Sequence, residues 1–435
     1  MEDILSEKFD VIVVGAGPAG SAAAYVAAKA GLKVLLLERG EYAGSKNTFG
    51  GVLYGPVLDD LFPAFWKEAP VERHITQRVI TFLSPEASFS LDFKDQAFDQ
   101  PPYNGFSVLR SGFDRWLAGK AQEAGALLVT ETLVEELLWE GEQAVGVRVM
   151  REDGDVRADV IIVADGVNSL LAKEAGLRKD FSPHHLSIGV KEVIQLPRDT
   201  IETRFRLREN EGVAHEFVGS CTRGAVGGGF LYTNQTSLSF GVVLQLQSLV
   251  ENGVRPWEAL EEFKNHPHIC GLIEGGTPKE YLAHLVPERG WSMLPRLYAP
   301  GLLVAGDAAG LVCARGITLE GANLALASGI MAGEVAGEAH QKKDFSKKVL
   351  AAYPEKLKDS FVLQDLETFR HSPDFLDNPN LYKAYPELVC GFARRLFSVT
   401  GEPKEKSLKM LRKEVGREIS LWQLLKDGLR AGRSL

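Results

Sequence analysis

The chain has 435 residues, of which 45% are hydrophobic and 25% are charged, and this balance is typical of folded rather than disordered proteins. The length exceeds one ordinary hydrophobic core, so two or three domains are expected. The net charge of −9 argues against general nucleic-acid binding, and we expect no nucleic-acid partner.

Cysteine content and hydropathy indicate which metal sites and which cellular locations are compatible with the sequence. The four cysteines are scattered without CxxC spacing, which disfavours a zinc site or an iron–sulfur cluster and suits a reducing compartment. We predict no metal site. The N-terminus has no charged-then-apolar signal, and no apolar run is long enough to cross a bilayer. We therefore expect a cytoplasmic location, peripheral on the inner face of the cell membrane.

A βαβ unit opens the chain. Residues 9–14 are nearly all apolar, as in a buried parallel strand, residues 18–30 form an alanine-rich helix, and residues 33–38 form a second apolar strand. Gly31 ends the helix. The turn that joins the first strand to the helix is Gly15-Ala16-Gly17-Pro18-Ala19-Gly20.

This GxGxxG turn is the first motif that carries chemistry. Its glycines permit a tight turn, a close approach of the backbone to a pyrophosphate, and close packing of helix on strand, while the helix N-terminus attracts phosphates. Glu38, followed by Arg39, ends the second strand eighteen residues after Gly20. A carboxylate in that place accepts hydrogen bonds from ribose hydroxyls, so the unit is predicted to bind a dinucleotide.

The middle of the chain adds further strands. Residues 51–71 are predicted to be loop-rich with a short helix, residues 80–93 to form alternating strands, and Ser111 to open a helix. Residues 127–149 predict several strands with a turn at residues 141–143.

The second motif follows an all-apolar strand over residues 160–164. It reads Ala164-Asp165-Gly166, in which a small residue and a glycine let the backbone pass close to a cofactor. Many tight turns have the same composition, so this motif indicates a cofactor site only in combination with the other motifs.

The later part begins with an antiparallel sheet, predicted from the alternation over residues 185–243. A parallel-type strand follows at residues 302–305, then a long helix over residues 319–336, and the remainder is mainly helical and polar. The third motif lies between this strand and this helix: Gly306-Asp307-Ala308-Ala309-Gly310, continued by Gly316-Ile317-Thr318-Leu319-Glu320-Gly321.

Asp307 is suited to accept a hydrogen bond from a ribityl hydroxyl of a flavin nucleotide. The N-terminus of the long helix would then point at the edge of the flavin ring where negative charge gathers on reduction. Tight packing of an Ala/Gly helix also explains its small residues, but not the Gly-Asp that precedes them.

The three motifs, in this order, resemble the FAD domains of the p-hydroxybenzoate-hydroxylase-like flavoproteins. The resemblance implies one bound FAD, with Arg110 at its pyrophosphate and the backbone of Val134 at its adenine. The element order predicts an α/β fold with a discontinuous Rossmann-type FAD-binding domain, an antiparallel β-rich quinone or substrate domain, and a C-terminal helical region. The expected limits are residues 1–80, 100–178 and 295–340, then 81–99 and 179–294, then 341–435.

Four further stretches, residues 49–70, 227–244, 266–288 and 353–370, resemble the electron-transfer-flavoprotein:quinone oxidoreductases and their shorter FixC-like relatives. The longer members end in a region with a four-cysteine iron–sulfur cluster, whereas Cys390 is the only cysteine after residue 320 here. This matches the FixC-like branch, in which a separate small ferredoxin-like subunit supplies the cluster. The lack of a second GxGxxG disfavours a disulfide-reductase-type enzyme.

The resemblance implies a flavin-dependent oxidoreductase. In such a system electrons pass from an electron-transfer flavoprotein of two subunits, through the ferredoxin-like subunit, to this FAD and then to a membrane quinone. In some relatives the partner flavoprotein bifurcates electrons from NADH between quinone and ferredoxin. The work of the chain is then binding, orientation and tuning of potential, so we nominate no catalytic residue.

The resemblance also indicates where the quinone binds. Backbone at Gly227 and Gly228 is expected at the quinone head, with Phe230 and Tyr232 lining the site; a strand bulge explains the two glycines equally well. The segment KNTFGG, which includes Lys46 and Gly50, is expected to cover the flavin. Lys46 either steadies the charge of the reduced flavin or is an ordinary surface lysine.

Two alternative functions remain open from the sequence. One is a geranylgeranyl-reductase-like enzyme that saturates prenyl double bonds on the same fold. The other is a non-catalytic subunit whose FAD serves as a relay or in docking.

The C-terminal region is basic. Residues 391–435 contain eleven Lys or Arg against five Asp or Glu, a net charge of +6. Residues 391–399 mix aromatic side chains with two arginines, and residues 422–425 add another apolar group, so the region either rests at a membrane interface as a peripheral contact or packs on the FAD domain. Packing is the preferred interpretation.

Overall fold

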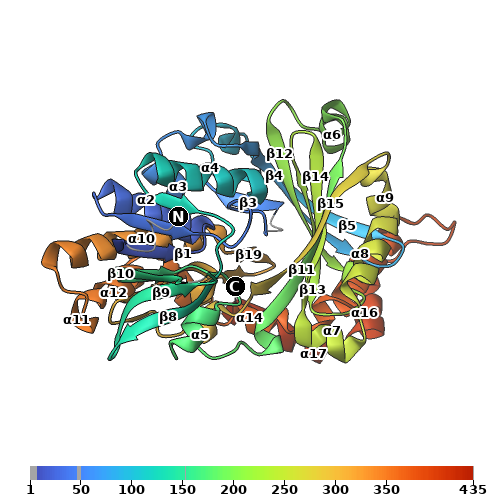
Figure 1. Cartoon of the computed structure of the whole chain (residues 1–435). Helices are drawn as coiled ribbons and strands as arrows, with labels where there is room; N and C mark the ends of the chain where they lie inside the picture. Colours follow the sequence, from blue (N-terminus) through green and yellow to red (C-terminus); the bar gives the residue numbers. More distant parts are fainter. Residues whose placement is uncertain (1–6, 47–49, 152, 435) are drawn as a thin grey trace.

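The computed structural model describes residues 7–46, 50–151 and 153–434. Two lobes lie side by side: an α/β lobe that begins the chain, and a lobe built on a strongly curved sheet (Figure 1). Helices of the last third, in orange and red, lie against the first lobe and the second lobe respectively (Figure 1).

The first lobe is built on a sheet with a parallel core. Strands β17, β10, β1, β2 and β7 are neighbours in this order and pair in parallel, while β16, β9 and β8 pair antiparallel. Its strands are β1 (Lys8–Val14), β2 (Val34–Leu37), β7 (Leu127–Val129), β8 (Val134–Glu140), β9 (Gln143–Val149), β10 (Asp155–Val163), β16 (Tyr298–Ala299) and β17 (Leu302–Val304).

Two helices with small side chains pack closely in this lobe. Helix α2 (Pro18–Lys29) begins with Pro at its first turn, where no backbone N–H is needed, and its alanines are buried. Helix α10 (Ala322–Lys342) packs along α2. A Cβ atom added at Gly329 would lie 2.0 Å from the carbonyl oxygen of Ala19, so only glycine permits this approach.

The second lobe is a curved sheet whose strands come from distant parts of the chain. The neighbours are β15-β11-β14-β13-β12-β4-β6-β3, with β5 paired to β4; every pair is antiparallel except β12 with β4. Its strands are β3 (Gly50–Tyr54), β4 (Val71–Leu83), β5 (Ser88–Lys94), β6 (Gly105–Leu109), β11 (Leu186–Gln195), β12 (Glu211–Gly219), β13 (Gly227–Thr233), β14 (Ser237–Gln245) and β15 (Thr277–Pro287).

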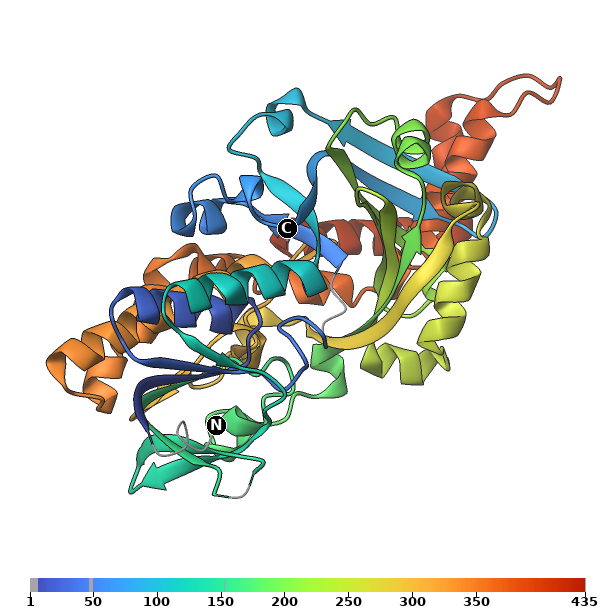
Figure 2. The same ribbon diagram turned by 45° about the horizontal axis from the view of Figure 1, so that its top comes forward.

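The two faces of the curved sheet have different roles. One face buries Phe240 and Phe217 against helix α8 (Pro256–Asn265), whose Phe263 stacks on Phe240 with ring centroids 4.5 Å apart. The other face looks toward the α/β lobe (Figure 2). Side chains at alternate positions therefore either join a core or face the space between the lobes.

The remaining helices surround the two sheets. Those before residue 300 are α3 (Pro56–Leu61), α4 (Arg110–Glu123), α5 (Leu170–Glu174), α6 (Arg198–Phe205), α7 (Leu246–Asn252) and α9 (Pro267–Ile273). The C-terminal helices are α11 (Lys347–Leu350), α12 (Ala352–Asp359), α13 (Phe361–Thr368), α14 (Ser372–Leu376), α15 (Ala384–Phe397), α16 (Ser407–Glu418) and α17 (Leu421–Ser434). Buried Tyr353 of α12 donates a hydrogen bond to the carbonyl oxygen of Val304, 2.9 Å away, which ties these helices to β17.

The predicted α/β fold with a second β-rich lobe and C-terminal helices is confirmed. Three details differ from the expectation. The curved sheet contains one parallel pair, β12 with β4, and it takes β3 and β6 from residues expected in the FAD-binding ranges. Helix α10 begins at Ala322, three residues later than predicted, because a two-stranded ribbon of β18 (Cys313–Arg315) and β19 (Thr318–Glu320) precedes it. The exact domain limits stay a prediction.

We predict that Gly329→Ala destabilises the protein by about 1–3 kcal/mol, since the added methyl group forces α10 away from α2. The matched control is Gly337→Ala on the same helix, where the new Cβ would lie 3.7 Å from the Cβ of Ala30, an ordinary contact. That variant should be neutral or more stable, by up to about 1 kcal/mol, because alanine favours helix. Urea unfolding followed by circular dichroism measures both. Equal midpoints for the two variants would refute the close contact.

Candidate functional site

A cavity of about 600 Å³ lies between the two lobes and is the centre of the site. Its first half is formed by the ends of β1, β2 and β10 and by the start of α2, and its second half by the inner face of β11 to β15. Its size is that of sites that enclose a cofactor or a drug-sized ligand. Parallel strands of an open sheet place such sites at their carboxyl ends, as here.

The glycine turn fits a close approach of the backbone to a ligand. Gly15 has a φ of +99°, and a Cβ there would lie 2.4 Å from the carbonyl oxygen of Ala164; a Cβ at Gly20 would lie 1.8 Å from the oxygen of Gly15. Gly17 caps α2 without a side-chain hydrogen bond, so the first N–H groups of the helix face the cavity. The turn is therefore held by packing and offers donors to an anion.

Glu38 is fixed beside this turn. Its Oε2 accepts a hydrogen bond from the N–H of Ala16 at 3.0 Å, and its Oε1 accepts one from Gly40 at 2.7 Å. The carboxylate lines the cavity at the end of β2, where it is available to a ribose.

Arg110 is held on the cavity wall by a buried carboxylate. Its Nε and Nη2 donate to Asp114 at 2.5 and 2.7 Å, one turn further along α4. This bidentate contact fixes the plane of the guanidinium, which lines the cavity near Gly17.

Two carboxyl groups from the other motifs also line the cavity. Burial raises the pKa of Asp165 and of Asp307, and the guanidinium of Arg110 opposes this rise at Asp307. In the described part of the chain, Oδ1 of Asp165 is buried without a hydrogen-bond partner. Such an atom marks a place for a ligand donor, and it supports the fit of a hydroxyl-rich nucleotide.

The structure brings most of the predicted residues into one cavity wall. Those that line it are Gly15, Gly17, Pro18, Ala19, Glu38, Arg39, Lys46, Arg110, Val134, Ala164, Asp165, Gly166, Asp307, Ile317, Leu319, Gly227, Gly228, Phe230 and Tyr232. Four predicted residues lie outside the lining: Gly20, Gly50, Gly306 and Gly316. Of the expected flavin cover, residues 47–49 lie outside the described residues.

The predicted quinone residues lie on β13. Phe230 and Tyr232 stack with ring centroids 5.2 Å apart, and the Phe230 ring covers Gly241 of the neighbouring strand. Gly227 has a φ of +147°, and a Cβ there would lie 2.1 Å from the oxygen of Val243. The β13–β14 ladder has no register shift at these glycines, so close strand packing, rather than a bulge, requires glycine at Gly227.

Several charged residues of the cavity were not predicted from the sequence. Arg78 donates to Glu216 at 3.0 Å and to the hydroxyl of Tyr54 at 3.3 Å across β4, β12 and β3. Lys191 of β11 is buried, which lowers its pKa to about 8, with Glu280 3.9 Å away. Each is one charged residue among several polar ones in its strand, so the sequence does not single it out.

Three more polar residues lie toward the C-terminal helices: Glu288, Asp377 and Tyr382. Burial raises the pKa of Glu288 to about 7, partly offset by the hydroxyl of Ser187 and by Arg289. These residues follow β15 or belong to the C-terminal segment, so no single motif of the sequence unites them.

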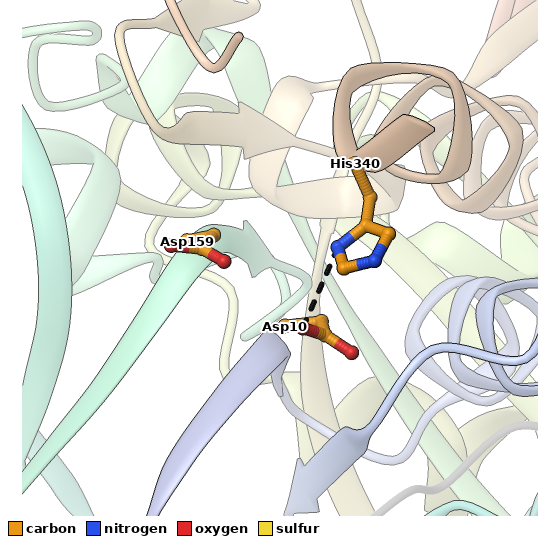
Figure 3. A group of neighbouring side chains, drawn as sticks. All are labelled: Asp10, Asp159 and His340. Carbon is orange, nitrogen blue, oxygen red and sulfur yellow. Dashed lines mark ion pairs between the residues drawn. The ribbon is translucent and has the colours of Figure 1, made fainter. Parts of the chain in front are cut away.

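A group of potential metal ligands lies away from the cavity. Asp10 of β1, Asp159 of β10 and His340 of α10 cluster at the amino ends of the strands (Figure 3). Lys8 already contacts Asp159 at 2.5 Å, and the N–H of Lys33 donates to Asp10 at 2.7 Å. These contacts satisfy the carboxylates, and we assign no metal to the group.

The fold and this cavity define a FAD-dependent oxidoreductase. A family model described as FAD dependent oxidoreductase matches residues 10–178, and one described as the ubiquinone-binding region of ETF-QO, the electron-transfer-flavoprotein:quinone oxidoreductase, matches residues 186–286. A third, the C-terminal domain of the ETF-QO/FixC family, matches residues 372–435.

The chain belongs to the ETF-QO/FixC family. It is 44% identical to protein FixC of Escherichia coli O157:H7 over 97% of this chain and 98% of that protein. It is 42% identical to a probable electron transfer flavoprotein-quinone oxidoreductase, YdiS, of Escherichia coli K12, over 99% of both chains. Protein FixC of Azotobacter vinelandii is also 42% identical, over 99% of this chain and 100% of that protein.

Solved structures share the fold at lower identity. A geranylgeranyl bacteriochlorophyll reductase-like protein from Thermoplasma acidophilum superposes with a TM-score of 0.73 at 22% identity, over 97% of this chain and 99% of that one. The myxobacterial chondrochloren halogenase CndH gives a TM-score of 0.66 at 19% identity, over 98% of this chain and 91% of that one. The family implies FAD as cofactor, in agreement with the donors that line the cavity.

We predict that Glu38→Ala weakens FAD binding about tenfold or more, because it removes the acceptor at the ribose position and releases the glycine turn. Titration of the apoprotein with FAD, followed by quenching of flavin fluorescence, measures the dissociation constant. Glu41→Ala, an exposed carboxylate outside the cavity lining, is the control and should bind as the unmodified chain does. Unchanged affinity in Glu38→Ala would contradict the assignment.

Proposed function

We propose that this chain is the FAD subunit of an electron-transfer-flavoprotein:quinone oxidoreductase system, which passes electrons by way of a separate ferredoxin-like subunit to membrane quinone. The observation that carries the proposal is the continuity of one cavity. Its nucleotide-binding half and the inner face of the ubiquinone-binding region, residues 186–286, line the same space. A redox cofactor and a quinone held there would be near neighbours.

Bound FAD would supply electron transfer in single or paired steps. The chain would hold it through the N–H groups at the start of α2, through Glu38 at the ribose, and through Arg110 at the pyrophosphate. Asp165 and Asp307 would accept hydrogen bonds from its hydroxyl groups. The enclosing lobes would exclude water, which strengthens these electrostatic contacts.

The need for a separate iron–sulfur subunit rests on the cysteines. Cys221, Cys313 and Cys390 are buried, Cys270 is exposed, and none of the four is in a disulfide. Among the described residues, the one group of three or more potential metal ligands contains no cysteine. The ferredoxin-like subunit and the two subunits of the electron-transfer flavoprotein are therefore the proposed partners.

The direct test uses the full chain loaded with FAD and reduced by light. Mixed anaerobically with a short-tail ubiquinone, it should be reoxidised with formation of one quinol per FAD, as followed by flavin absorbance. Failure to reduce any quinone, with the purified partners present or absent, would refute the proposal. Saturation of prenyl double bonds without a partner would instead establish a geranylgeranyl-reductase-like activity.

We predict that Phe230→Ala raises the KM for quinone about tenfold, because an aromatic surface is lost from the cavity wall. The FAD content should stay unchanged, since β13 lies in the second half of the cavity. The control is Phe93→Ala, an exposed aromatic residue of β5 outside the cavity lining. An unchanged KM in Phe230→Ala would remove this residue from the quinone site.

The C-terminal helices support a peripheral membrane contact. Among the described residues, no helix is both long and apolar enough to span a bilayer. Helix α15 packs on β4, β5 and β12 of the curved sheet rather than on the FAD-binding lobe, yet Phe397 and Val399 at its end remain exposed. Helix α15 thus packs on the protein, but on the curved sheet and not on the FAD domain as the preferred prediction had it, and its C-terminal end is exposed.

Helix α17 has an unusual orientation for a helix of a globular protein. Its polar face is docked, because Asp427 accepts hydrogen bonds from Tyr385 at 2.6 Å and Asn380 at 3.0 Å. Its apolar face is exposed, with Trp422 at 78%. The other exposed apolar residues of α17 are Leu421, Leu425 and Leu429. With basic neighbours, this face fits the interface of an anionic membrane, and we propose that the chain rests there on the cytoplasmic side.

We predict that the triple variant Trp422→Ser, Leu425→Ser, Leu429→Ser lowers binding to anionic lipid vesicles about fivefold or more in flotation assays, because its apolar anchor is removed. Trp257→Ser, which removes an exposed tryptophan on α8, is the matched control and should float like the unmodified chain. Equal flotation of the triple variant would exclude α17 as the contact.

A further inference from the structure

A row of ionisable side chains extends from the proposed quinone-binding end of the cavity to solvent. It begins at Glu288, the residue directly after β15. Oε1 of Glu288 accepts a hydrogen bond from the hydroxyl of Ser187. Glu288 lines the cavity, and its neighbour Arg289 is buried. Glu216, another carboxylate that lines the cavity, accepts a hydrogen bond from Arg78 of the neighbouring strand β4 at 3.0 Å.

The sheet register places Glu288 beside the predicted quinone glycines. Ser187 pairs with Gln245 on the next strand, and the N–H of Gln245 donates to the oxygen of Val226 at 2.9 Å, one residue before Gly227. Two strand spacings, about 10 Å, therefore separate Ser187 from this segment. A ligand head group resting on Gly227 and Gly228 would therefore lie about two strand spacings from Ser187.

Tyr382 closes the remaining side of this space. Its ring lines the cavity, its hydroxyl donates to the oxygen of Leu376 at 2.7 Å, and the backbone of Gly227 hydrogen-bonds to it. Tyr382 and Glu288 are close enough for the Glu288 charge to raise the pKa of the tyrosine, although burial is the larger cause.

The other end of this row of side chains is exposed to solvent. Asp377 accepts hydrogen bonds from Arg289 and, at 3.2 Å, from the amide of Gln245. His184 lies 3.5 Å from Asp377, and 38% of its side chain is exposed. Asp377 and His184 thus lie between Arg289, the chain neighbour of Glu288, and solvent.

We propose that Glu288 is the proton carrier for quinone reduction: its carboxyl donates to the quinone oxygen held at Gly227 and Gly228, and Asp377 and His184 return the proton from solvent. The inference rests on the proposed quinone oxidoreductase function and adds a residue to it. The activity described for the family involves a quinone, and the role of Glu288 is inferred from the position and contacts of its side chain.

The reaction balances as follows. A quinone gains two electrons, from the electron-transfer flavoprotein, and two protons to become a quinol. For the oxygen held at Gly227 and Gly228, the O–H bond of the protonated Glu288 breaks and an O–H bond forms on that oxygen, which leaves Glu288 as a carboxylate; the oxygen at the opposite end of the ring takes the second proton from water. A solvent proton then restores the acid before the next quinone is reduced.

The pKa of Glu288, raised to about 7 by burial, suits this task near neutral pH. The hydroxyl of Ser187 and the charge of Arg289 lower the pKa of Glu288, and the charge of Asp377 raises it. Tyr382, His184 and His185 are the other titratable groups that face this end of the cavity. Because the protonated acid is the donor, quinone reduction should slow as pH rises through about 7.

The experiment compares Glu288→Gln with the unmodified full chain, each loaded with FAD, reduced by light and mixed with a short-tail ubiquinone. We expect reoxidation by quinone to slow by at least about tenfold, and the fall in rate above pH 7 to disappear. Reoxidation by ferricenium, a one-electron acceptor that takes no proton, should keep its rate. Asp374→Asn is the matched control, since this exposed carboxylate lies 3.7 Å from Arg289 but outside the cavity lining.

Two further outcomes decide the inference. If Glu288→Gln reduces quinone at the unmodified rate and with the same pH profile, Glu288 is not the carrier, although the proposed function stands. If the unmodified chain does not reduce quinone at all, the proposed function itself fails. Should Glu288→Gln not fold, Ser187→Ala replaces it: loss of the hydroxyl should move the pH limb upward, and an unmoved limb would overturn the inference.

Discussion

Close contact between backbones is the constraint on which the rest of the structure depends. Gly15 lies against Ala164, the residue after β10, Gly20 against Gly15, and Gly329 against Ala19, each so closely that a single methyl group does not fit. These contacts join three segments that are distant in sequence. The ends of β1, β2 and β10 therefore lie together in one wall, which positions the glycine turn, Glu38 and Asp165.

The sequence predicts this half well because its signals are local. A glycine turn, a buried strand before it and a carboxylate at the end of the next strand fall within about thirty residues of one βαβ unit, and the structure assembles Gly17, Glu38 and Asp307 around one cavity. The start of α10 is less predictable, since β19, Thr318–Glu320, leads almost directly into the helix and is only three residues long.

The second half of the cavity is a different case. Arg78 and Glu216 meet only because β4 and β12 pair in parallel, across 138 residues of chain. Glu288 and Tyr382 meet because the C-terminal helices return to the curved sheet. Periodicity indicates which strands are half-buried, but it does not say which strands are neighbours. The charged groups of this half are therefore visible only in the assembled fold, whereas Phe230 and Tyr232 were found through family resemblance.

The way in which α17 is attached has a consequence of its own. Asp427 holds the helix through hydrogen bonds to Tyr385 and Asn380, while Trp422 and Leu425 take no part in that attachment. The attachment of α17 to the protein and its contact with another surface thus use opposite faces of the helix, so that neither prevents the other. The proposed membrane contact can therefore form and break without any rearrangement of the tertiary structure, and its strength depends on the exposed apolar side chains together with lipid charge and ionic strength.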